Sequence, residues 1–268
     1  MVWRSIARSR NMRTIILLAA AATALAAAAP AAAVTTFANF SARAGGNNVR
    51  WVRTAGTGNA SFYSIATNTG STPASRLVNF SFLQPSIAPY VTNVTARWTL
   101  NGTVSSTVAT VNGATLEQNN LTGSFSFLTT APITIGGNSF AVGSNLLSGT
   151  FNRTVLSGNR AGNSAGISGS TPSSTISFTS DFLDFSNTLN RNFALNLTSI
   201  VPVLQANPIT GTPTGAINNF RAVAGGSFSS DPAPIVTAVP EPGSWAMMLA
   251  GMGLVGFARR RRQISLPA

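Results

Sequence analysis

The chain has 268 residues, of which 44% are hydrophobic and 8% charged, and it contains no cysteine and no histidine. This composition excludes disulfides, thiolate nucleophiles, cysteine-based metal sites and histidine acid–base catalysis. The formal charge of +12 lies mostly at the two ends, because residues 34–239 hold nine arginines against four carboxylates. Those nine arginines are scattered along the chain, whereas a nucleic-acid-binding protein clusters Arg or Lys with interleaved aromatic residues, so we expect no nucleic-acid binding.

An export signal is predicted at residues 1–33. Four arginines and no acidic residue precede residue 14, and an apolar run then extends to residue 29. Ala31 and Ala33 occupy the small-residue positions before a cleavage site. This order of segments is that of a secretory signal peptide. We expect the signal helix to be removed, so that the mature protein begins near Val34.

Residues 34–230 are predicted to form a single all-β domain of the β-sandwich or jelly-roll type. Alternating apolar and polar residues indicate strands, and the clearest alternation covers Tyr90–Asn101. Asn-Gly pairs at residues 101–102 and 112–113 predict hairpin turns. Further strands are predicted at residues 49–53, 61–67, 77–83, 104–111, 121–128, 149–155, 175–185, 192–200 and 219–228. Residues 157–174, which are rich in Ser and Gly, are predicted to be a loop.

The one close pair of acidic residues in this body is Asp181 and Asp184. On a strand, a separation of three residues places two side chains on opposite faces. We therefore expect solvated or capping aspartates; a calcium site and a catalytic pair are the alternatives, and each requires a bend that brings the carboxylates together. Without His or Lys to activate a serine, the sequence predicts no catalytic residue, no metal, no cofactor and no enzymatic activity.

Aromatic side chains are the candidates for contact with sugar rings. Tyr90 and Trp98 share a predicted strand face with aliphatic residues, which favours burial in the core. Trp51 lies between Arg50 and Arg53 and is predicted to be exposed, which makes it the candidate carbohydrate contact. A flat, regular threonine array, as ice binding requires, is not evident in the sequence.

A proline-rich linker, residues 231–239, is predicted to connect the body to a short hydrophobic helix. Residues 245–258 carry no charge, and a helix of this length spans roughly 21–24 Å at about 1.5 Å per residue. The hydrocarbon core of a bilayer is about 30 Å thick, so we expect a transient transmembrane segment rather than a lasting anchor. The arginine cluster at residues 259–262 places its C-terminal end on the cytoplasmic side.

The same end of the chain contains a sequence motif. Its residues are Pro240, Glu241, Pro242, Trp245, Arg259, Arg260, Arg261 and Arg262. Residues 240–262 resemble the C-terminal sorting signal of PEP-CTERM proteins, in its PEPxxWA variant, and such proteins are substrates of bacterial exosortases. The resemblance implies transient insertion in the inner membrane, cleavage near the motif by an exosortase, and a final location at the cell surface or outside the cell. It also implies a Gram-negative bacterium that makes exopolysaccharide and biofilm.

Two functions are consistent with these observations. The first is that of an exported, non-catalytic cell-surface or extracellular-matrix protein associated with biofilm and exopolysaccharide. The alternative is a carbohydrate-binding module that holds exopolysaccharide through Trp51 and neighbouring polar side chains. Exposed aromatic side chains favour the second function, whereas buried ones favour the first. An enzyme would require a cleft that contains both Asp181 and Asp184.

Overall fold

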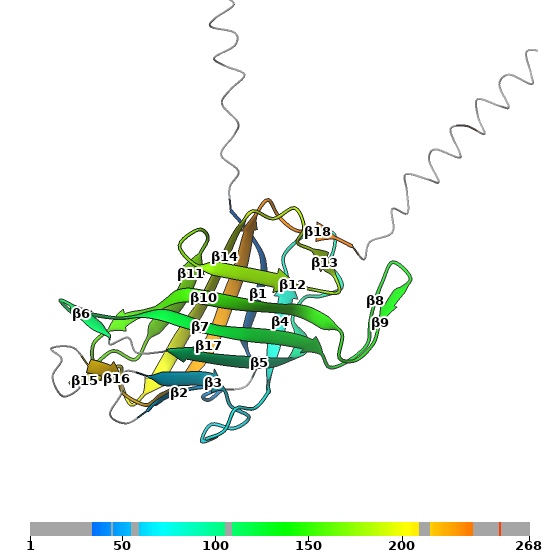
Figure 1. Cartoon of the computed structure of the whole chain (residues 1–268). Coiled ribbons are helices and arrows are strands. Elements are labelled where there is room, and N and C mark those ends of the chain that lie inside the picture. The colour runs from blue at the N-terminus through cyan, green and yellow to red at the C-terminus, as the bar shows by residue number, and fades with distance from the viewer. Residues whose placement is uncertain are drawn as a thin grey trace, which may run out of the picture. The chain divides into compact units, whose positions relative to one another are not determined.

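The structure is a computed structural model, and it describes residues 34–43, 45–54, 59–104, 109–208 and 215–237 together with Met252. The predicted signal helix, and all but one residue of the predicted C-terminal segment, lie outside these residues. Apart from Met252, which is helical, the described residues form β-strands, turns and connecting segments, which confirms the all-β prediction for the body (Figure 1). They include no helix with the length and hydrophobicity needed to cross a membrane.

Twelve strands form one large antiparallel sheet. They are β1 (Thr35–Ala42), β2 (Val49–Arg53), β3 (Ala60–Ser64), β4 (Arg76–Phe82), β5 (Val94–Val104), β6 (Thr110–Asn112), β7 (Thr115–Thr129), β10 (Asn145–Asn159), β11 (Ala165–Ser170), β12 (Thr175–Thr179), β14 (Asn190–Val201) and β17 (Phe220–Asp231). The other strands form two-stranded sheets. These pair β8 (Ile133–Ile135) with β9 (Asn138–Phe140), β13 (Leu183–Asp184) with β18 (Ile235–Val236), and β15 (Ala206–Pro208) with β16 (Gly215–Ile217).

The large sheet closes on itself. Its strands are hydrogen-bonded in the order β1-β4-β5-β3-β2-β17-β14-β11-β10-β7-β6, and the additional pairings of β5 with β7 and of β1 with β17 complete the circuit. In Figure 1, the front layer contains β5, β7, β10 and β12, and these strands cross β1, β14 and β17 behind them at a large angle. The core is therefore enclosed by two layers that cross as in orthogonal packing, but hydrogen bonds join these layers into a single sheet.

A buried asparagine completes the hydrogen bonding of β17. This long strand pairs along one edge with β2 as far as Ala222 and with β1 from Gly226 onward. Between these two pairings, the Asn48 side chain accepts a hydrogen bond from Ala224 N at 2.7 Å and donates one to Ala224 O at 3.1 Å. Asn48 is 1% exposed, so its amide replaces the backbone partner that neither shorter strand supplies.

Serine side chains also bind backbone groups at two other points where a long strand changes from one partner strand to another. β5 pairs with β4 and then with β3, and between them the Ser64 hydroxyl accepts a hydrogen bond from Leu100 N at 3.0 Å. β10 pairs with β12 and then with β11, and between them the Ser174 hydroxyl donates to Arg153 O at 3.0 Å. Each long strand can thus change partners without leaving these buried backbone groups unpaired.

The core between the layers is built mainly from phenylalanine rings. The ring centroid of Phe228 lies 4.9–6.2 Å from those of five other phenylalanines, which come from β1, β7, β12 and β14. Inward-facing glycines make room for rings of this size. A Cβ atom at Gly102 would lie 2.1 Å from the Phe62 ring, and one at Gly149 would lie 2.8 Å from the Phe125 ring. Large and small residues therefore alternate across the core.

Several predicted elements differ from the observed ones. Asn101 and Gly102 do not form a turn, because β5 continues through both residues and pairs with β3 on one side and β7 on the other. Residues 157–174 are not a loop, because β11 lies within them and is hydrogen-bonded to both β10 and β14. Tyr90 lies before β5 and is 46% exposed rather than buried. The turn predicted at residues 112–113 is shifted by one residue, because Asn112 ends β6 and pairs with Thr115, so that residues 113–114 connect β6 to β7.

The proline-rich segment after β17 is hydrogen-bonded to the rest of the body. β18 pairs with β13, and Gln84 Nε2 donates a hydrogen bond to Pro234 O at 2.7 Å. Thr237 N donates another to Phe182 O at 3.1 Å. The backbone is therefore held against the body as far as Thr237, three residues before Pro240.

Candidate functional site

Uncharged polar side chains cover the outer surface of β5, β7, β10 and β12. The strand register arranges twelve of them, ten hydroxyls and two amides, in three rows, and none of the twelve is buried. One row holds Thr99, Ser126, Ser148 and Thr179; the next holds Asn101, Ser124, Thr150 and Ser177; the third holds Thr103, Thr122, Asn152 and Thr175. We call these twelve residues the hydroxyl face.

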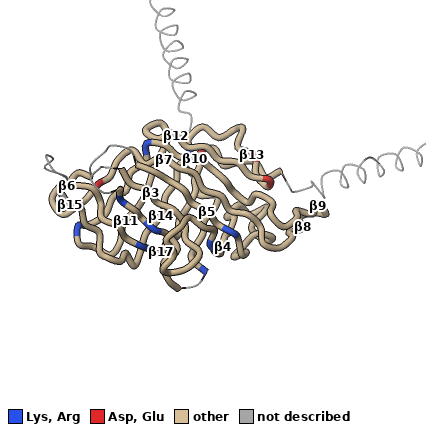
Figure 2. The backbone as a smooth tube through the Cα atoms, turned by 60° about the horizontal axis from the view of Figure 1, so that its bottom comes forward, with Lys and Arg blue, Asp and Glu red and all other residues tan. Residues whose placement is uncertain are grey.

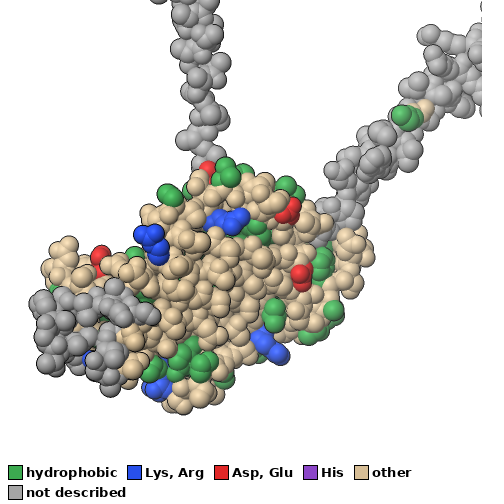
Figure 3. Space-filling view, in the orientation of Figure 1, with side chains coloured by type: hydrophobic (Ala, Val, Ile, Leu, Met, Phe, Trp, Pro, Cys, Tyr) green, Lys and Arg blue, Asp and Glu red, His purple; other side chains and the backbone are tan. Residues whose placement is uncertain are grey.

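The hydroxyl face arises from strict alternation along each strand. In β7, for example, Ser124 and Ser126 point outward while Phe125 and Phe127 enter the core. Adjacent strands lie about 4.8 Å apart, and alternate residues on one strand about 6.6 Å apart. Four strands and three rows therefore give a patch of roughly 14 Å by 13 Å between Cα atoms. Figure 3 shows this side of the molecule as a broad polar surface, with charged side chains around its margin.

Hydrogen bonds across the strands fix the orientation of these side chains. Thr99 Oγ1 lies 2.7 Å from Ser126 Oγ, and Thr150 Oγ1 lies 2.7 Å from Ser177 Oγ. In the third row, Thr122 Oγ1 donates to an Asn152 side-chain oxygen at 2.7 Å. Each hydroxyl has one donor and two acceptor sites, so these bonds leave capacity for a ligand. The hydroxyl face was not predicted from the sequence, although Ser and Thr alternate with apolar residues in the predicted strands at residues 121–128, 149–155 and 175–185.

A cavity with one exposed aromatic side chain lies beyond one end of this face. Tyr90 lines it, and its volume is about 450 Å³. The other lining residues belong to the start of β5, the end of β7, the segment after β7 and the first two residues of β8: Val94, Thr95, Thr129, Thr130, Ala131, Pro132, Ile133 and Thr134. Thr130 Oγ1 donates a hydrogen bond to Thr95 O at 2.8 Å, which ties the segment after β7 to β5. The cavity thus combines an aromatic ring with aliphatic and hydroxyl groups.

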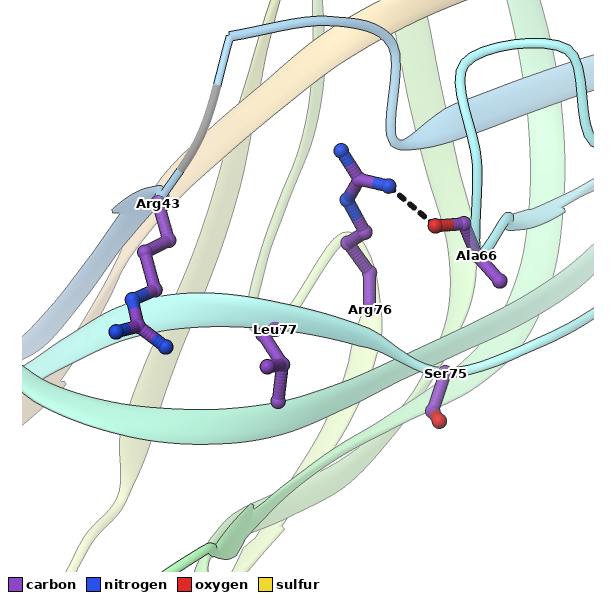
Figure 4. Close-up of a pocket in the computed structure, with 5 residues that line it drawn as sticks. All are labelled: Arg43, Ala66, Ser75, Arg76 and Leu77. Carbon is purple, nitrogen blue, oxygen red and sulfur yellow. Dashed lines mark hydrogen bonds between the residues drawn. The ribbon is translucent and has the colours of Figure 1, made fainter.

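A second cavity, of about 480 Å³, is lined by two arginines together with Ala66, Ser75 and Leu77. Figure 4 shows the guanidinium groups of Arg43 and Arg76 pointing away from each other, with Leu77 between them. Arg76 donates a hydrogen bond to Ala66 O. The two cations therefore do not converge on a common point where an anion could bind.

Arginines close to this cavity stabilise the connection between β3 and β4. Arg50 Nη1 donates to Gly70 O at 3.2 Å, and Arg221 Nη2 donates to Thr69 O at 3.4 Å. Together with Arg76, they bind three backbone carbonyls within residues 66–70. Figure 2 shows the arginines of the body on several strands, and the three beside residues 66–70 are occupied by these backbone carbonyls.

Asp181 and Asp184 have separate, local partners. Asp181 Oδ2 accepts a hydrogen bond from Asn145 N at 2.7 Å. Asp184 accepts two hydrogen bonds from Ser186, from its backbone N at 2.8 Å and from its hydroxyl at 2.9 Å. These are the contacts of capping aspartates. Within the described ranges there is no cluster of three or more potential metal-ligating residues.

Trp51 is in the core, so the prediction of an exposed ring is wrong. It is 1% exposed and stacks between Phe62 and Phe220, with ring centroids 5.6 and 5.8 Å away. The flanking arginines did not indicate exposure, because β2 is paired on both edges and its alternate residues face the core. Trp98 is also buried, as predicted. A sugar ring therefore has no access to either indole, whereas Tyr90 is accessible.

The predicted sorting residues, Pro240 to Arg262, lie outside the described residues except for Met252, as do Ala31 and Ala33. Comparison with protein-family models matches residues 238–262 to the PEP-CTERM protein-sorting motif. The chain carries a PEP-CTERM sorting signal. This match confirms the resemblance found in the sequence, and the PEP-CTERM motif implies an exported protein that an exosortase sorts to the cell surface or the exterior. Comparisons with curated proteins and with solved structures found no significant match.

Proposed function

We propose that this PEP-CTERM protein is a non-catalytic component of the cell surface or extracellular matrix of a Gram-negative bacterium, associated with biofilm and exopolysaccharide. The observation that supports sorting is the match at residues 238–262. In this proposal, the signal peptide directs export, and the short apolar segment holds the C-terminus in the inner membrane until an exosortase cleaves the chain. The body is then attached at the surface or released.

The contacts within the body support a non-catalytic role. Asp181 and Asp184, the candidate acid–base pair, are each bound to local hydrogen-bond donors rather than facing a common cleft. The body also has a continuous core and a large hydrogen-bonded sheet, which suit a protein that persists outside the cell. An enzyme remains the third alternative, and it would require catalytic groups other than this pair.

The position of the cleavage site is part of the proposal. The backbone is bound to the body as far as Thr237, and the apolar segment begins near Trp245. Only a short stretch around the PEP motif therefore lies between the body and the membrane. We place the exosortase cut there, between Pro240 and Gly243.

Mass spectrometry of surface and secreted fractions tests this function. We expect body peptides at high abundance and no peptide that contains Met247 or Met248, because the C-terminal helix is left behind. Replacing Glu241 or Pro242 should retain the precursor in the inner membrane, whereas Glu117→Ala, which changes the other glutamate of the chain, should leave sorting unchanged. Tail and body peptides at equal abundance in the surface fraction would contradict the proposal.

A carbohydrate-binding module is the second candidate function, and the hydroxyl face favours it. Sugar-binding sites combine hydrogen-bonding groups with an apolar or aromatic surface. The hydroxyl face and the Tyr90 cavity offer both, whereas Trp51 does not. A purified protein that binds no polysaccharide in solution would leave the purely structural matrix role as the better description.

A further inference from the structure

The hydroxyl face and the Tyr90 cavity belong to one continuous strip along β5 and β7. The outward residues of the two strands face each other in five successive levels. From the cavity outward, these are Thr95 with Thr130, Arg97 with Leu128, Thr99 with Ser126, Asn101 with Ser124, and Thr103 with Thr122. At about 3.3 Å per residue, the strip is roughly 26 Å long, and Tyr90 lines the cavity to which Thr95 and Thr130 of the first level also belong.

We propose that this strip binds a neutral polysaccharide, with the glycan chain extended along β5 and β7 and one sugar ring stacked against Tyr90. The proposal deepens the carbohydrate-binding function given above and rests on it. It replaces the buried Trp51 with Tyr90 as the aromatic contact. The residues of the hydroxyl face on β10 and β12 extend the binding surface on one side of the glycan.

The chemistry of the strip matches that of a neutral sugar polymer. Sugar hydroxyls both donate and accept hydrogen bonds, and so do the hydroxyl and amide groups of the hydroxyl face. The apolar faces of sugar rings need aromatic or aliphatic contacts, and Tyr90, Leu128 and Pro132 provide them. The exposed fraction of Tyr90, 46%, leaves its ring accessible.

The charges near the strip favour a neutral chain over an acidic one. Arg97 is the one charged side chain among the five levels. Leu128, its partner on β7, pairs in turn with Asn145 of β10, whose backbone N–H binds the Asp181 carboxylate. The Asp181 carboxylate is thus the acidic group linked to this level, and its repulsion of an acidic polymer offsets part of the attraction to Arg97. The other levels are uncharged.

The strip is also organised before a ligand arrives. Its outward side chains are on paired strands, and the bonds from Thr99 to Ser126 and from Thr122 to Asn152 hold their rotamers. Binding therefore costs little side-chain entropy on the protein side. Because several sugar units bind at once, weak contacts at each level add up along the chain.

Native affinity electrophoresis tests this inference with the exported protein purified from its producing cells. The gels contain hydroxyethyl cellulose, dextran or galactomannan as neutral probes, and alginate as the acidic probe. We expect at least one neutral polysaccharide to retard the protein. Retardation should persist in about 0.5 M NaCl, because salt screens interactions between charges and not those between uncharged groups.

Two variants test where the glycan binds. Tyr90→Ala removes the stacking ring, and Asn101→Arg places a long charged side chain in the middle row. Each should weaken binding at least about tenfold, which corresponds to 1.4 kcal/mol. Asn196→Arg is the matched control, because Asn196 is an exposed asparagine on β14 in the other layer, and it should bind as the parent does. Thermal unfolding of all three variants verifies that they are folded.

The outcomes distinguish failure of the site from failure of the function. Full binding by folded Tyr90→Ala and Asn101→Arg variants would overturn the site but leave a carbohydrate-binding module. No retardation by any of the polysaccharides would overturn both. Retardation by alginate alone, abolished by salt, would overturn the neutral ligand class.

Discussion

Asn48 should be among the residues whose side-chain polarity matters most for stability. Asn48→Ala removes the partners of both Ala224 N and Ala224 O, which lie 2.7 and 3.1 Å from the side chain. Each buried backbone group left unpaired costs about 1–3 kcal/mol, so we expect a loss of roughly 2–6 kcal/mol in the free energy of unfolding. For a domain of this size, 1 kcal/mol corresponds to about 2–4 °C in Tm. Tm should therefore fall by roughly 5–20 °C.

The isosteric variant Asn48→Asp separates hydrogen bonding from packing. It keeps the acceptor for Ala224 N but places a carboxylate oxygen against Ala224 O, and a buried unpaired charge costs about 3–5 kcal/mol. Burial favours the protonated carboxyl, which can donate to that carbonyl, so the variant should lose less stability at about pH 4 than at about pH 7.

Differential scanning calorimetry of the purified parent and variants measures these effects. Asn196→Ala is the control, because Asn196 is exposed on the neighbouring strand β14, and it should change Tm by no more than about 2 °C. If Asn48→Ala unfolds within about 2 °C of the parent, Asn48 does not complete the hydrogen bonding of β17 and the reasoning is refuted.

Three further predictions concern the core and the aspartates. Trp51→Ala should lower the free energy of unfolding by about 3–5 kcal/mol. Trp51→Phe should lower it by less than half of that, because the indole Nε1 has no hydrogen-bond partner and its loss removes an unpaired buried donor. Equal decreases in Tm for the two variants in thermal denaturation would contradict this. Gly123→Ala should cost about 1–3 kcal/mol, because its Cβ would lie 2.4 Å from Asn101 O, whereas Gly45→Ala has open space and should be close to neutral in chemical denaturation. EDTA should not change the Tm of the protein, since Asp181 and Asp184 bind local hydrogen-bond donors; a drop in Tm that calcium reverses would identify a metal site instead.

Much of the strand content could be predicted because a strand with one buried face alternates apolar and polar residues in the sequence. Residues 49–53 coincide with β2, and the alternation around Trp98 correctly places that side chain in the core. The Asn-Gly pairs predicted turns less reliably. Asn-Gly is a strong turn signal only where no partner holds the backbone straight, and at residues 101–102 pairing on both edges of β5 overrides it.

Exposure could not be predicted where it depends on distant strands. Trp51 is buried because Phe62 and Phe220 stack on its two sides, and Phe220 is far away in the chain. Tyr90 is exposed because the chain turns before β5 begins. Ser, Gly and Asn in residues 157–174 resemble a loop by composition, yet two neighbouring strands supply the backbone hydrogen bonds that make β11.

The sequence by itself determined the strand-rich body and the PEP-CTERM signal, because both depend on residues that are close together in the chain. The strands are marked by apolar and polar residues that alternate with a period of two, and the signal by a motif followed by an apolar run and arginines. The tertiary structure alone decided which polar residues face the same side. Thr99, Ser126 and Thr179 are distant in the chain, and only the register of four strands brings them into one row. A shift of one residue in any of these strands would turn its hydroxyls into the core, so the hydroxyl face depends on the pairing of the whole sheet.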